Sequence, residues 1–560
     1  MNDHDSPAQD GDPRADARPS GRSARRLGLV VGGSLSEGLD VRLDSSRSVE
    51  DMAVGKYVII QGQRSRFFAI LNDVKLRSTS PEIAWSLPEL ADDFSREVMA
   101  GTATFGSLHV VPYLKTGATA DAAFEPAKTV PGHFAEVWDA SQEDVERIFG
   151  QDDGDHFVIG SPLDMEVKVC LNYQRFAERS NGVFGKSGTG KTFLTRHILA
   201  YVILKSSDQR EARRRVVNLV FDMHNEYGWE GSSEGQSGKV KGLKQLLGAA
   251  VAVFTLDPES SRRRGVPTDA VVEIGLDEVE PEDVEVLQET LNLTDLAVQA
   301  CSPLERRFHK RWIEETIALD TADEESRALL KELNIDERSL RSLRRGLERL
   351  RRLAFLRPHS DQSSVNTILG YLDKGRNVVL EFGRYGNDLT AYIFVANLLT
   401  RRIHERYRQQ TEAALGETAQ EPIHLMITIE EAHKFLNPTV AGQTVFGQIA
   451  REMRKYNVTL LVVDQRPSAI EGEVMSQVGT KIACLLDNEA DVDAVLAGVG
   501  EKRELRSVLA RLESRQQALI FGHAVPMPVV VRTEDWGTEE CYRRFTRPTL
   551  KERLEDIASD

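Results

Sequence analysis

Cysteine is scarce in this chain. Only four cysteines occur among 560 residues, and no two are spaced as a CxxC pair. They are Cys170, Cys301, Cys484 and Cys541. A disulfide scaffold needs a higher density of cysteine, and a zinc site needs cysteines or histidines in close pairs. The 12 histidines show no such clustering, so we expect reduced thiols, as in a cytosolic protein.

Long apolar runs are missing as well. The longest, residues 247–256 (LGAAVAVFTL), is too short to span a bilayer. No apolar core of a secretory signal follows the first residues. We therefore expect a cytoplasmic protein without a membrane segment.

Positive charge is in deficit. Lys and Arg number 71 against 87 Asp and Glu, which gives a formal net charge of −16. This balance argues against a protein that coats nucleic acid with its whole surface. It is compatible with a basic channel inside an acidic particle, because net charge does not describe how charge is distributed.

The first 135 residues contain two segments of different composition. Residues 1–24 contain almost no large apolar side chain, so they are expected to form a disordered tail. From residue 25 the chain changes to short β-type runs, such as GKYVIIQG and RFFAILNDVKL, separated by Gly, Asp and Ser. Such spacing predicts a small all-β barrel or sandwich over residues 25–135.

The rest of the chain alternates strand-like and helix-like stretches, which is typical of an α/β fold with a mostly parallel, helix-covered sheet. We predict this motor domain in two parts, residues 136–271 and 373–532, separated by a charged, Leu-periodic helical insertion over 272–372. Residues 533–560 are expected to form a C-terminal extension. Nearly continuous apolar runs predict the buried strands: residues 216–222, 376–382, 423–429, 458–464 and 518–524.

The strongest motif is a complete GxxxxGK[ST] loop. It follows a short strand-like NGVF segment and precedes a helical pattern, which is the context of a phosphate-binding P-loop. Its residues are Gly185, Lys186, Ser187, Gly188, Thr189, Gly190, Lys191 and Thr192. Backbone N–H groups and the helix N-terminus would surround the phosphates of ATP. Lys191 is expected to reach the β and γ phosphates, and Thr192 to bind Mg²⁺.

Two adjacent glutamates follow the predicted strand 423–429. Glu430 takes the metal-side position by register, and Glu431 the position that activates the attacking water. Most P-loop enzymes carry Asp at the first position, so the division of roles between the two stays open. The alternative is a solvated acidic helix start. His433 follows them without HExxH spacing, which argues against zinc.

Two further polar residues lie at, or directly after, the ends of predicted strands. Asp222 closes strand 216–222, at the edge of the sheet where ligands bind in such folds. Polar strand ends without a function are equally common. Gln465 follows strand 458–464, where an amide can sense the γ-phosphate or orient the water.

Basic side chains occur in two helical segments. Arg451 and Arg454 lie three residues apart on one helix face, either as surface residues or as arginine fingers for a neighbouring nucleotide. Residues 341–352 hold six arginines, but Leu343 and Leu347 within them recur at helical spacing. This pattern favours a buried stripe with a solvated basic face over a DNA patch.

Together these segments resemble the HerA/FtsK superfamily of P-loop motors, and specifically the HerA-like ATPases. The resemblance covers most of the chain. The matching segments are the P-loop, DMHNEYG at 222–228, IEEAHKFL at 429–436, REMRKYNVTLLVVDQRPSAIEGEVMSQVGTKI at 451–482 and ALIFGHAVPMPVVVR at 518–532. The β-rich residues from Leu27 resemble the N-terminal barrel of the family.

The resemblance implies a RecA-like motor that assembles as a homo-hexamer, with ATP and Mg²⁺ at subunit interfaces and double-stranded DNA in the pore. It favours Asp222, Glu431 and Gln465 as active-site residues, and Arg451 or Arg454 as the arginine finger. It also implies a separate partner, either a nuclease in DNA end processing or an effector enzyme in phage defence.

Two functional hypotheses follow. The first is a DNA translocase or helicase subunit that couples ATP hydrolysis to movement along duplex DNA. The second is a ring scaffold that binds ATP to assemble and activate an effector, with little DNA movement. A transfer ATPase at a membrane is a weaker third hypothesis, since it would need a separate membrane partner.

Overall fold

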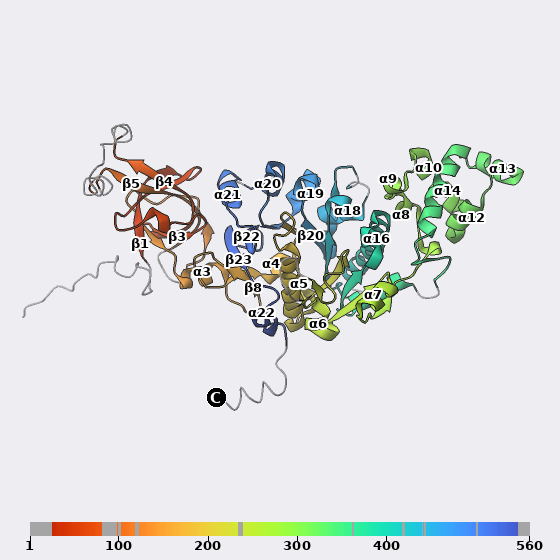
Figure 1. Ribbon diagram of the computed structural model, residues 1–560, viewed down its shortest axis with the longest axis horizontal. Helices are drawn as coiled ribbons and strands as arrows, with labels where there is room; N and C mark the ends of the chain where they lie inside the picture. Colours follow the sequence, from red (N-terminus) through yellow and green to blue (C-terminus); the bar gives the residue numbers. More distant parts are fainter. Residues whose placement is uncertain are drawn as a thin grey trace, which may run out of the picture.

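The computed structural model has three parts in a row: a β-barrel, an α/β motor domain and a helical end (Figure 1). It describes residues 25–546 except for short gaps at 81–97, 99–101, 118–121, 233–238, 361–362, 417–419, 440, 442–443 and 500–501. The predicted tail, residues 1–24, and the last part of the predicted C-terminal extension, residues 547–560, lie outside the described residues.

The N-terminal part is a closed antiparallel barrel, which confirms the barrel and excludes the sandwich. Its strands follow the order β2-β1-β7-β3-β4-β5, and pairing of β2 with β5 closes the ring. The strands are β1 (Arg26–Ser34), β2 (Gly38–Leu43), β3 (Tyr57–Gln61), β4 (Ser65–Ser78), β5 (Thr104–Gly117) and β7 (Glu136–Asp139), and the short β6 (Glu125–Pro126) pairs with β5. Alternate residues such as Val41, Ile60 and Val110 fill the interior, as the two-residue period of a strand requires.

Helix α3 (Gln142–Phe149) joins the barrel to the motor domain. Ser141 and Asp144 form a capping box at its start, with each side chain bonded to the other residue's backbone N–H. This arrangement satisfies two otherwise unpaired donors of the first turn. The buried residues of α3, including Phe149, pack with the core on one face of the motor sheet.

The motor domain is built on one sheet of 12 strands. In sheet order these are β15 (Ala270–Val271), β14 (Val251–Thr255), β18 (Asn377–Glu381), β11 (Val216–Asp222), β19 (His424–Glu430), β20 (Val458–Asp464), β10 (Asn181–Phe184), β21 (Thr480–Ala483), β22 (Gln517–Gly522), β23 (Val529–Thr533), β8 (His156–Ser161) and β9 (Val169–Asn172). Pairing is parallel from β15 to β21 and antiparallel from β21 to β9. The α/β fold predicted from the apolar runs is confirmed.

Helices cover both faces of this sheet, and alternate strand residues divide between the two cores. On β11, Val216 and Val220 pack on the side of α5 (Lys191–Asp208), whereas Leu219 and Phe221 pack on the side of α16 (Leu389–Leu415). The face with α5 also carries α4 (Tyr173–Ala177), α6 (Leu243–Leu247) and α22 (Glu539–Arg543). The opposite face carries α15 (Ser364–Asp373), α18 (Val445–Glu452), α19 (Gly472–Gln477), α20 (Glu489–Val495) and α21 (Lys502–Leu509).

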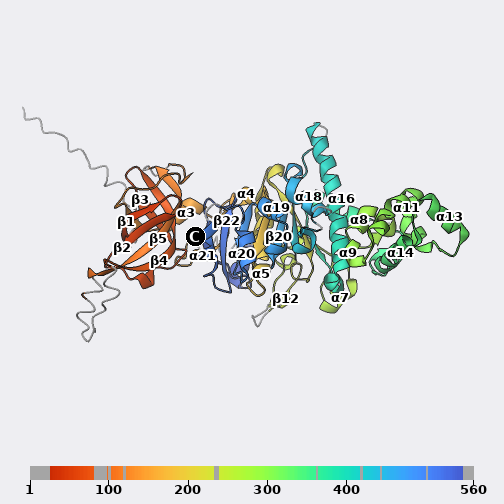
Figure 2. The ribbon, with the colours of Figure 1, turned by 90° about the horizontal axis from the view of Figure 1, so that it is seen from above.

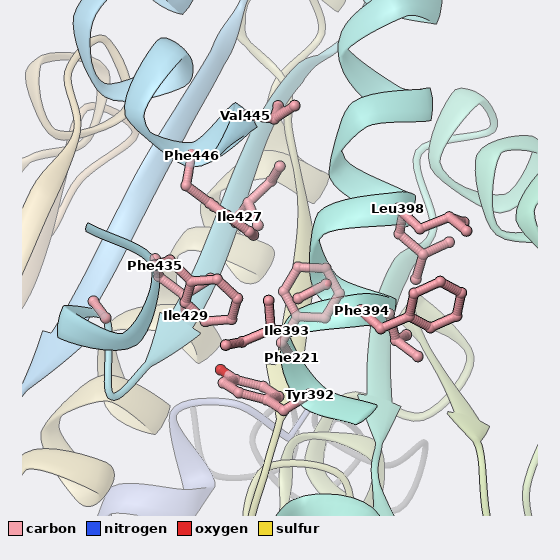
Figure 3. Close-up of a cluster of buried hydrophobic side chains, with 14 of the residues drawn as sticks. Phe221, Tyr392, Ile393, Phe394, Leu398, Ile427, Ile429, Phe435, Val445 and Phe446 are labelled. Carbon is pink, nitrogen blue, oxygen red and sulfur yellow. The ribbon is translucent and has the colours of Figure 1, made fainter. Parts of the chain in front are cut away.

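The core between α16 and the sheet is rich in aromatic rings. Figure 3 shows Phe221 and Ile427 on the strands, on the side of the helix from which Tyr392 projects. The rings of Phe435 and Phe446 approach to 4.7 Å between centroids. Burial of these side chains fixes the position of β19, whose last residue is a predicted site residue.

A helical unit extends from the far end of the motor domain, opposite the barrel (Figures 1 and 2). It consists of α8 (Pro281–Glu285), α9 (Gln288–Leu291), α10 (Asp295–Gln299), α11 (Cys301–Phe308), α12 (Trp312–Ala318), α13 (Glu324–Glu332) and α14 (Glu337–Arg351). Strands β16 (Ile274–Gly275) and β17 (Leu356–Arg357) pair in parallel where the chain enters and leaves it. On α14, Leu343 and Leu347 are fully buried, as the periodicity indicates. Five arginines of this helix are exposed: Arg338, Arg341, Arg345, Arg349 and Arg351.

The smaller elements lie mostly in the connections of the motor domain. They are α7 (Pro258–Arg264), the β12–β13 pair (Gly231–Ser232 and Lys239–Val240), α17 (His433–Leu436) and, in the described part of the chain, eight short 3₁₀ turns. The four cysteines are buried and unpaired. Within the described residues, no helix combines the length and apolarity needed to cross a membrane.

Candidate nucleotide site

The P-loop connects β10, near the middle of the parallel strands, to α5. Strand β10 lies between β20 and β21, so the loop emerges at the carboxyl edge of the sheet. Gly188 and Gly190 have φ values of 78° and 89°, a conformation that side chains with a Cβ disfavour. Helix α5 begins at Lys191 without a side-chain cap, which leaves its first N–H groups available for an anion.

Lys191 points back over its own loop. Its Nζ donates to the carbonyl oxygen of Lys186 at 2.8 Å, and Thr189 Oγ1 donates to the same carbonyl at 2.8 Å. Burial lowers the pKa of Lys191, while the negative charges of Glu431 and Glu430 act in the opposite direction. The ammonium therefore stands between the phosphate loop and the acidic strand ends, where it can neutralise phosphate charge.

A cavity of about 390 Å³ opens beside the P-loop. It is bounded by most of the loop, by the glutamate pair and by the end of β20. Residues from α5, from the loop after β11 and from the segments next to β22 and β23 complete the lining. The lining residues are Ser187, Gly188, Thr189, Gly190, Lys191, Thr192, Phe193, Arg196, His224, Glu226, Glu430, Glu431, Val463, Asp464, Gln465, Arg515, Gln516 and Asp535. The structure thus brings the predicted Lys191, Thr192, Glu430, Glu431 and Gln465 to one place.

Glu430, the last residue of β19, is 6% exposed. Its Oε1 accepts a hydrogen bond of 2.9 Å from the hydroxyl of Tyr227, and its Oε2 has no hydrogen-bond partner among the described residues. Burial, followed by the charges of Asp222 and Glu226, raises the pKa of Glu430 to about 8.

A buried carboxylate oxygen without a donor is the ligand that Mg²⁺ prefers in a P-loop site. Glu430 and the Thr192 hydroxyl, which lines the same cavity, therefore fit the predicted metal pair. No group of three or more His, Cys, Asp or Glu that could hold a metal by itself occurs in the described part of the chain. A metal here would accordingly need the oxygens of the phosphates as further ligands.

Glu431 occupies a strained position. Its φ is 49°, in the left-handed region that non-glycine residues rarely adopt and that occurs at functional sites. Its Oε1 accepts a hydrogen bond of 3.1 Å from Nε2 of Gln465. This contact joins the two residues predicted to orient and activate water.

The turn after Glu431 is held by Asp464, which the sequence analysis did not single out. The buried Asp464 carboxylate accepts hydrogen bonds from the backbone N–H groups of His433 at 2.7 Å and Arg466 at 2.6 Å. It also lies 3.0 Å from Nδ1 of His433 and raises the pKa of that imidazole. His433 thus supports the glutamate pair, consistent with the argument against a zinc site. One feature of the sequence could have indicated this role: Asp464 directly precedes the predicted site residue Gln465.

Asp222 does not line the cavity. Its fully buried carboxylate accepts three backbone N–H bonds, from Glu226 at 2.7 Å, Tyr227 at 2.8 Å and Gly228 at 3.3 Å. Burial and the nearby charge of Glu381 raise its pKa to about 7. Asp222 folds the loop that brings Glu226 to the cavity and Tyr227 to Glu430, so it has a positioning role.

Arg451 lies outside the cavity lining of its own chain. Its guanidinium contacts Glu471, and its Nε donates to Glu473 at 3.1 Å. The side chain of Arg454 lies outside the described part of the structure. The choice between the two as an arginine finger therefore stays a prediction.

Residues 157–403 match the protein family described as "Helicase HerA, central domain". This span begins in β8, contains the whole P-loop and ends in α16. The matched residues cover the core of the motor domain, which is similar to the HerA-like P-loop ATPases. The resemblance noted from the motifs is thereby confirmed, and with it the assignment as an ATPase.

Two curated relatives of this chain carry the same name. "DNA double-strand break repair helicase HerA" of Pyrococcus furiosus is 36% identical over 111 residues, which are 19% of this chain and 20% of that protein. The protein of that name from Saccharolobus solfataricus is 23% identical over 403 residues, 71% of each chain. The alignment therefore spans a fifth of the first relative and about seven tenths of the second.

Solved structures with a similar architecture include two P-loop proteins. One is VirB4 of Thermoanaerobacter pseudethanolicus, with a TM-score of 0.43, 14% identity and coverage of 70% of this chain and 99% of that one. The other is the plasmid coupling protein TrwB in complex with ADP and Mg²⁺, with a TM-score of 0.45, 14% identity and coverage of 72% and 94%.

Four residues of the cavity were not predicted from the sequence, because they come from elements without a recognisable motif. Arg196 lies on the second turn of α5, Arg515 and Gln516 precede β22, and Asp535 follows β23. Strands β22 and β23 are antiparallel to their neighbours, so the start of β22 and the end of β23 reach the same edge as the P-loop. No sequence motif indicates where these two antiparallel strands lie in the sheet.

Proposed function

We propose that this ATPase moves along double-stranded DNA as a subunit of a homo-hexameric ring and works with a separate nuclease or effector protein. ATP hydrolysis with Mg²⁺ supplies the energy for this movement. The role assigned to the partner is either DNA end processing or phage defence.

The observation that carries the nucleotide chemistry is the convergence of five predicted residues on one cavity. Lys191 neutralises the β and γ phosphates, and Glu430 with Thr192 holds the metal. The Glu431 carboxylate, fixed by Gln465, accepts a proton from the attacking water. Mg²⁺, when bound, neutralises phosphate charge and favours departure of the diphosphate.

Two observations support the ring and its DNA track. The curated relatives are named as DNA double-strand break repair helicases. Arg451 is held by two glutamates outside the nucleotide cavity of its own chain, as expected for an arginine that acts on the nucleotide of a neighbouring subunit. A ring of such subunits completes each site with a residue from the next copy.

The test is the rate of ATP hydrolysis with and without blunt duplex DNA, over a series of salt concentrations. We expect duplex DNA to raise the rate, and the DNA affinity to fall linearly with salt on logarithmic axes, because phosphate contacts release counterions. A rate that is independent of duplex DNA at every salt concentration would exclude the DNA track while leaving the ATPase in place.

The variant Glu431→Gln distinguishes the DNA translocase from the ring scaffold. Removal of the general base should lower the rate of hydrolysis about 100-fold or more and retain ATP binding. A translocase loses its DNA-dependent activity in this variant. Retention of full partner activation would support the ring scaffold instead.

A further inference from the structure

Arg196 is the most unusual charged residue near the cavity. It is 2% exposed, and neither its Nε nor its Nη1 has a hydrogen-bond partner among the described residues. Its guanidinium carbon lies 5.5 Å from the centroid of the Phe193 ring. The side chain nevertheless lines the nucleotide cavity.

This arrangement is unfavourable unless a ligand completes it. An arginine does not lose its charge in a protein, so it cannot avoid the penalty of burial by deprotonation. A buried guanidinium is normally paired or fully hydrogen-bonded. Arg196 keeps two donor nitrogens free, which indicates that its acceptors come from outside the described chain.

The position of Arg196 separates it from the phosphate loop. It is four residues after Thr192, so it lies on the same face of α5, about 6 Å further along the helix. The loop amides and Lys191 surround the phosphates on the near side of this point. Arg196 therefore faces a part of the ligand beyond the phosphates.

The same cavity receives polar residues from the C-terminal strands. Asp535 follows β23, and the exposed Gln516 precedes β22 with a φ of 57°. Helix α22 anchors this segment to the motor domain, since the hydroxyl of Tyr542 accepts a hydrogen bond of 2.9 Å from the backbone N–H of Lys241. A carboxylate and a guanidinium outside the phosphate loop thus both line this cavity.

We propose that Arg196 and Asp535 form the subsite for the nucleoside half of ATP. Arg196 donates to acceptor atoms of the base or ribose, and Asp535 accepts from a ribose hydroxyl. The inference rests on the proposed nucleotide chemistry and adds to it the groups that distinguish ATP from a bare triphosphate chain. It also makes the C-terminal segment part of the binding site.

The experiment compares ATP with inorganic tripolyphosphate, each with Mg²⁺, by titration calorimetry on the full chain. In Arg196→Met the affinity for ATP should fall about tenfold or more, which is the value of a charge-assisted hydrogen bond. The affinity for tripolyphosphate should stay within about twofold, because the phosphate loop is intact. The melting temperature of the nucleotide-free variant should be equal or higher, because a buried unpaired charge has been replaced by an apolar side chain of similar length.

Lys205→Met is the matched control. Lys205 is a buried cation on the same helix, but its Nζ pairs with Asp152 at 2.6 Å, far from the cavity. This variant should lose stability and keep the wild-type ratio of the two affinities. Asp535→Asn should shift the ratio in the same direction as Arg196→Met.

Equal losses for both ligands in Arg196→Met would overturn the nucleoside assignment in favour of a phosphate contact. Unchanged ATP affinity would overturn it as well. Failure of the proposed nucleotide chemistry is distinguishable, since the wild-type chain would then bind neither ligand.

Discussion

Tyr227 sets the orientation of the metal-side carboxylate. Its hydroxyl donates to Oε1 of Glu430 and leaves Oε2 without a partner. The ring is fully buried, so it has few alternative positions. The sequence pattern identifies Glu430, but the donor comes from a loop 203 residues earlier in the chain, which no local motif reveals.

Tyr227→Phe should raise the Mg²⁺ concentration needed for half-maximal ATP hydrolysis several-fold, because Glu430 loses the donor that fixes its orientation. Stability should fall by about 1 kcal/mol. The measurement is a Mg²⁺ titration of the hydrolysis rate. Tyr57→Phe is the control, since its hydroxyl donates to the carbonyl oxygen of Pro528 at 3.5 Å, and it should leave the Mg²⁺ requirement unchanged.

His433 should make stability depend on pH. Because Asp464 raises its pKa, the folded protein binds the proton more tightly than the unfolded chain. The stabilisation is therefore complete below the unfolded pKa of about 6.5, and it is lost as pH rises through the higher folded value. We expect wild type to melt about 2 °C above His433→Gln at pH 6, with a smaller difference at pH 8. A difference that grows with pH would contradict this assignment.

At the scale of elements, burial determined what could be predicted. The central strands are nearly continuous apolar runs because helices cover both faces, and β11 was predicted with its observed bounds. By contrast, β22 and β23 join the same sheet in antiparallel order, and only tertiary pairing brings Asp535 to the site. Arg196 is a polar residue in a helix, so its burial is equally invisible in the sequence.

Helix α16 holds the helical unit through a buried ion pair. Nε and Nη2 of Arg401 contact the two carboxylate oxygens of Asp283 at 3.1 and 2.7 Å, and the Asp283 side chain is fully buried. Arg401→Met leaves this carboxylate unpaired, so it should destabilise the chain by about 3 kcal/mol or more.

The effect of Arg401→Met should appear as faster amide exchange in α8 and in the first turns of α16. Arg406→Met provides the comparison, because its ion pair with Asp373 is half-exposed at the arginine and is worth about 1 kcal/mol or less. Similar exchange in both variants would argue against a structural role for the Arg401 pair.

At the scale of the whole molecule, the barrel and the helical unit lie at opposite ends of the motor domain (Figure 2). The barrel contacts the motor through α21 and the C-terminal strands: Ser507 Oγ lies 3.4 Å from the carbonyl oxygen of Asn72, and Gly55 packs against Val530. The nucleotide cavity lies between these ends, on the edge of the sheet.

Assembly of the proposed ring should depend on the nucleotide. Native mass spectrometry of Glu431→Gln with Mg²⁺ and ATP should show a hexamer, because bound ATP remains uncleaved at the subunit boundary. Lys191→Ala should lower ATP affinity and shift the distribution towards smaller species. Identical distributions for the two variants, with and without ATP, would argue against nucleotide-linked assembly.

The ends of the 12-stranded sheet limit how copies of the chain can associate. One boundary strand, β15, has only two residues, and the other, β9, is adjoined by α3. Neither offers a row of free backbone groups long enough to template a strand from another molecule. In the proposed ring, copies of the chain would therefore contact one another through side chains rather than through this sheet. An intermolecular β-ladder, the usual first step towards fibrous aggregation, is disfavoured in this large open sheet.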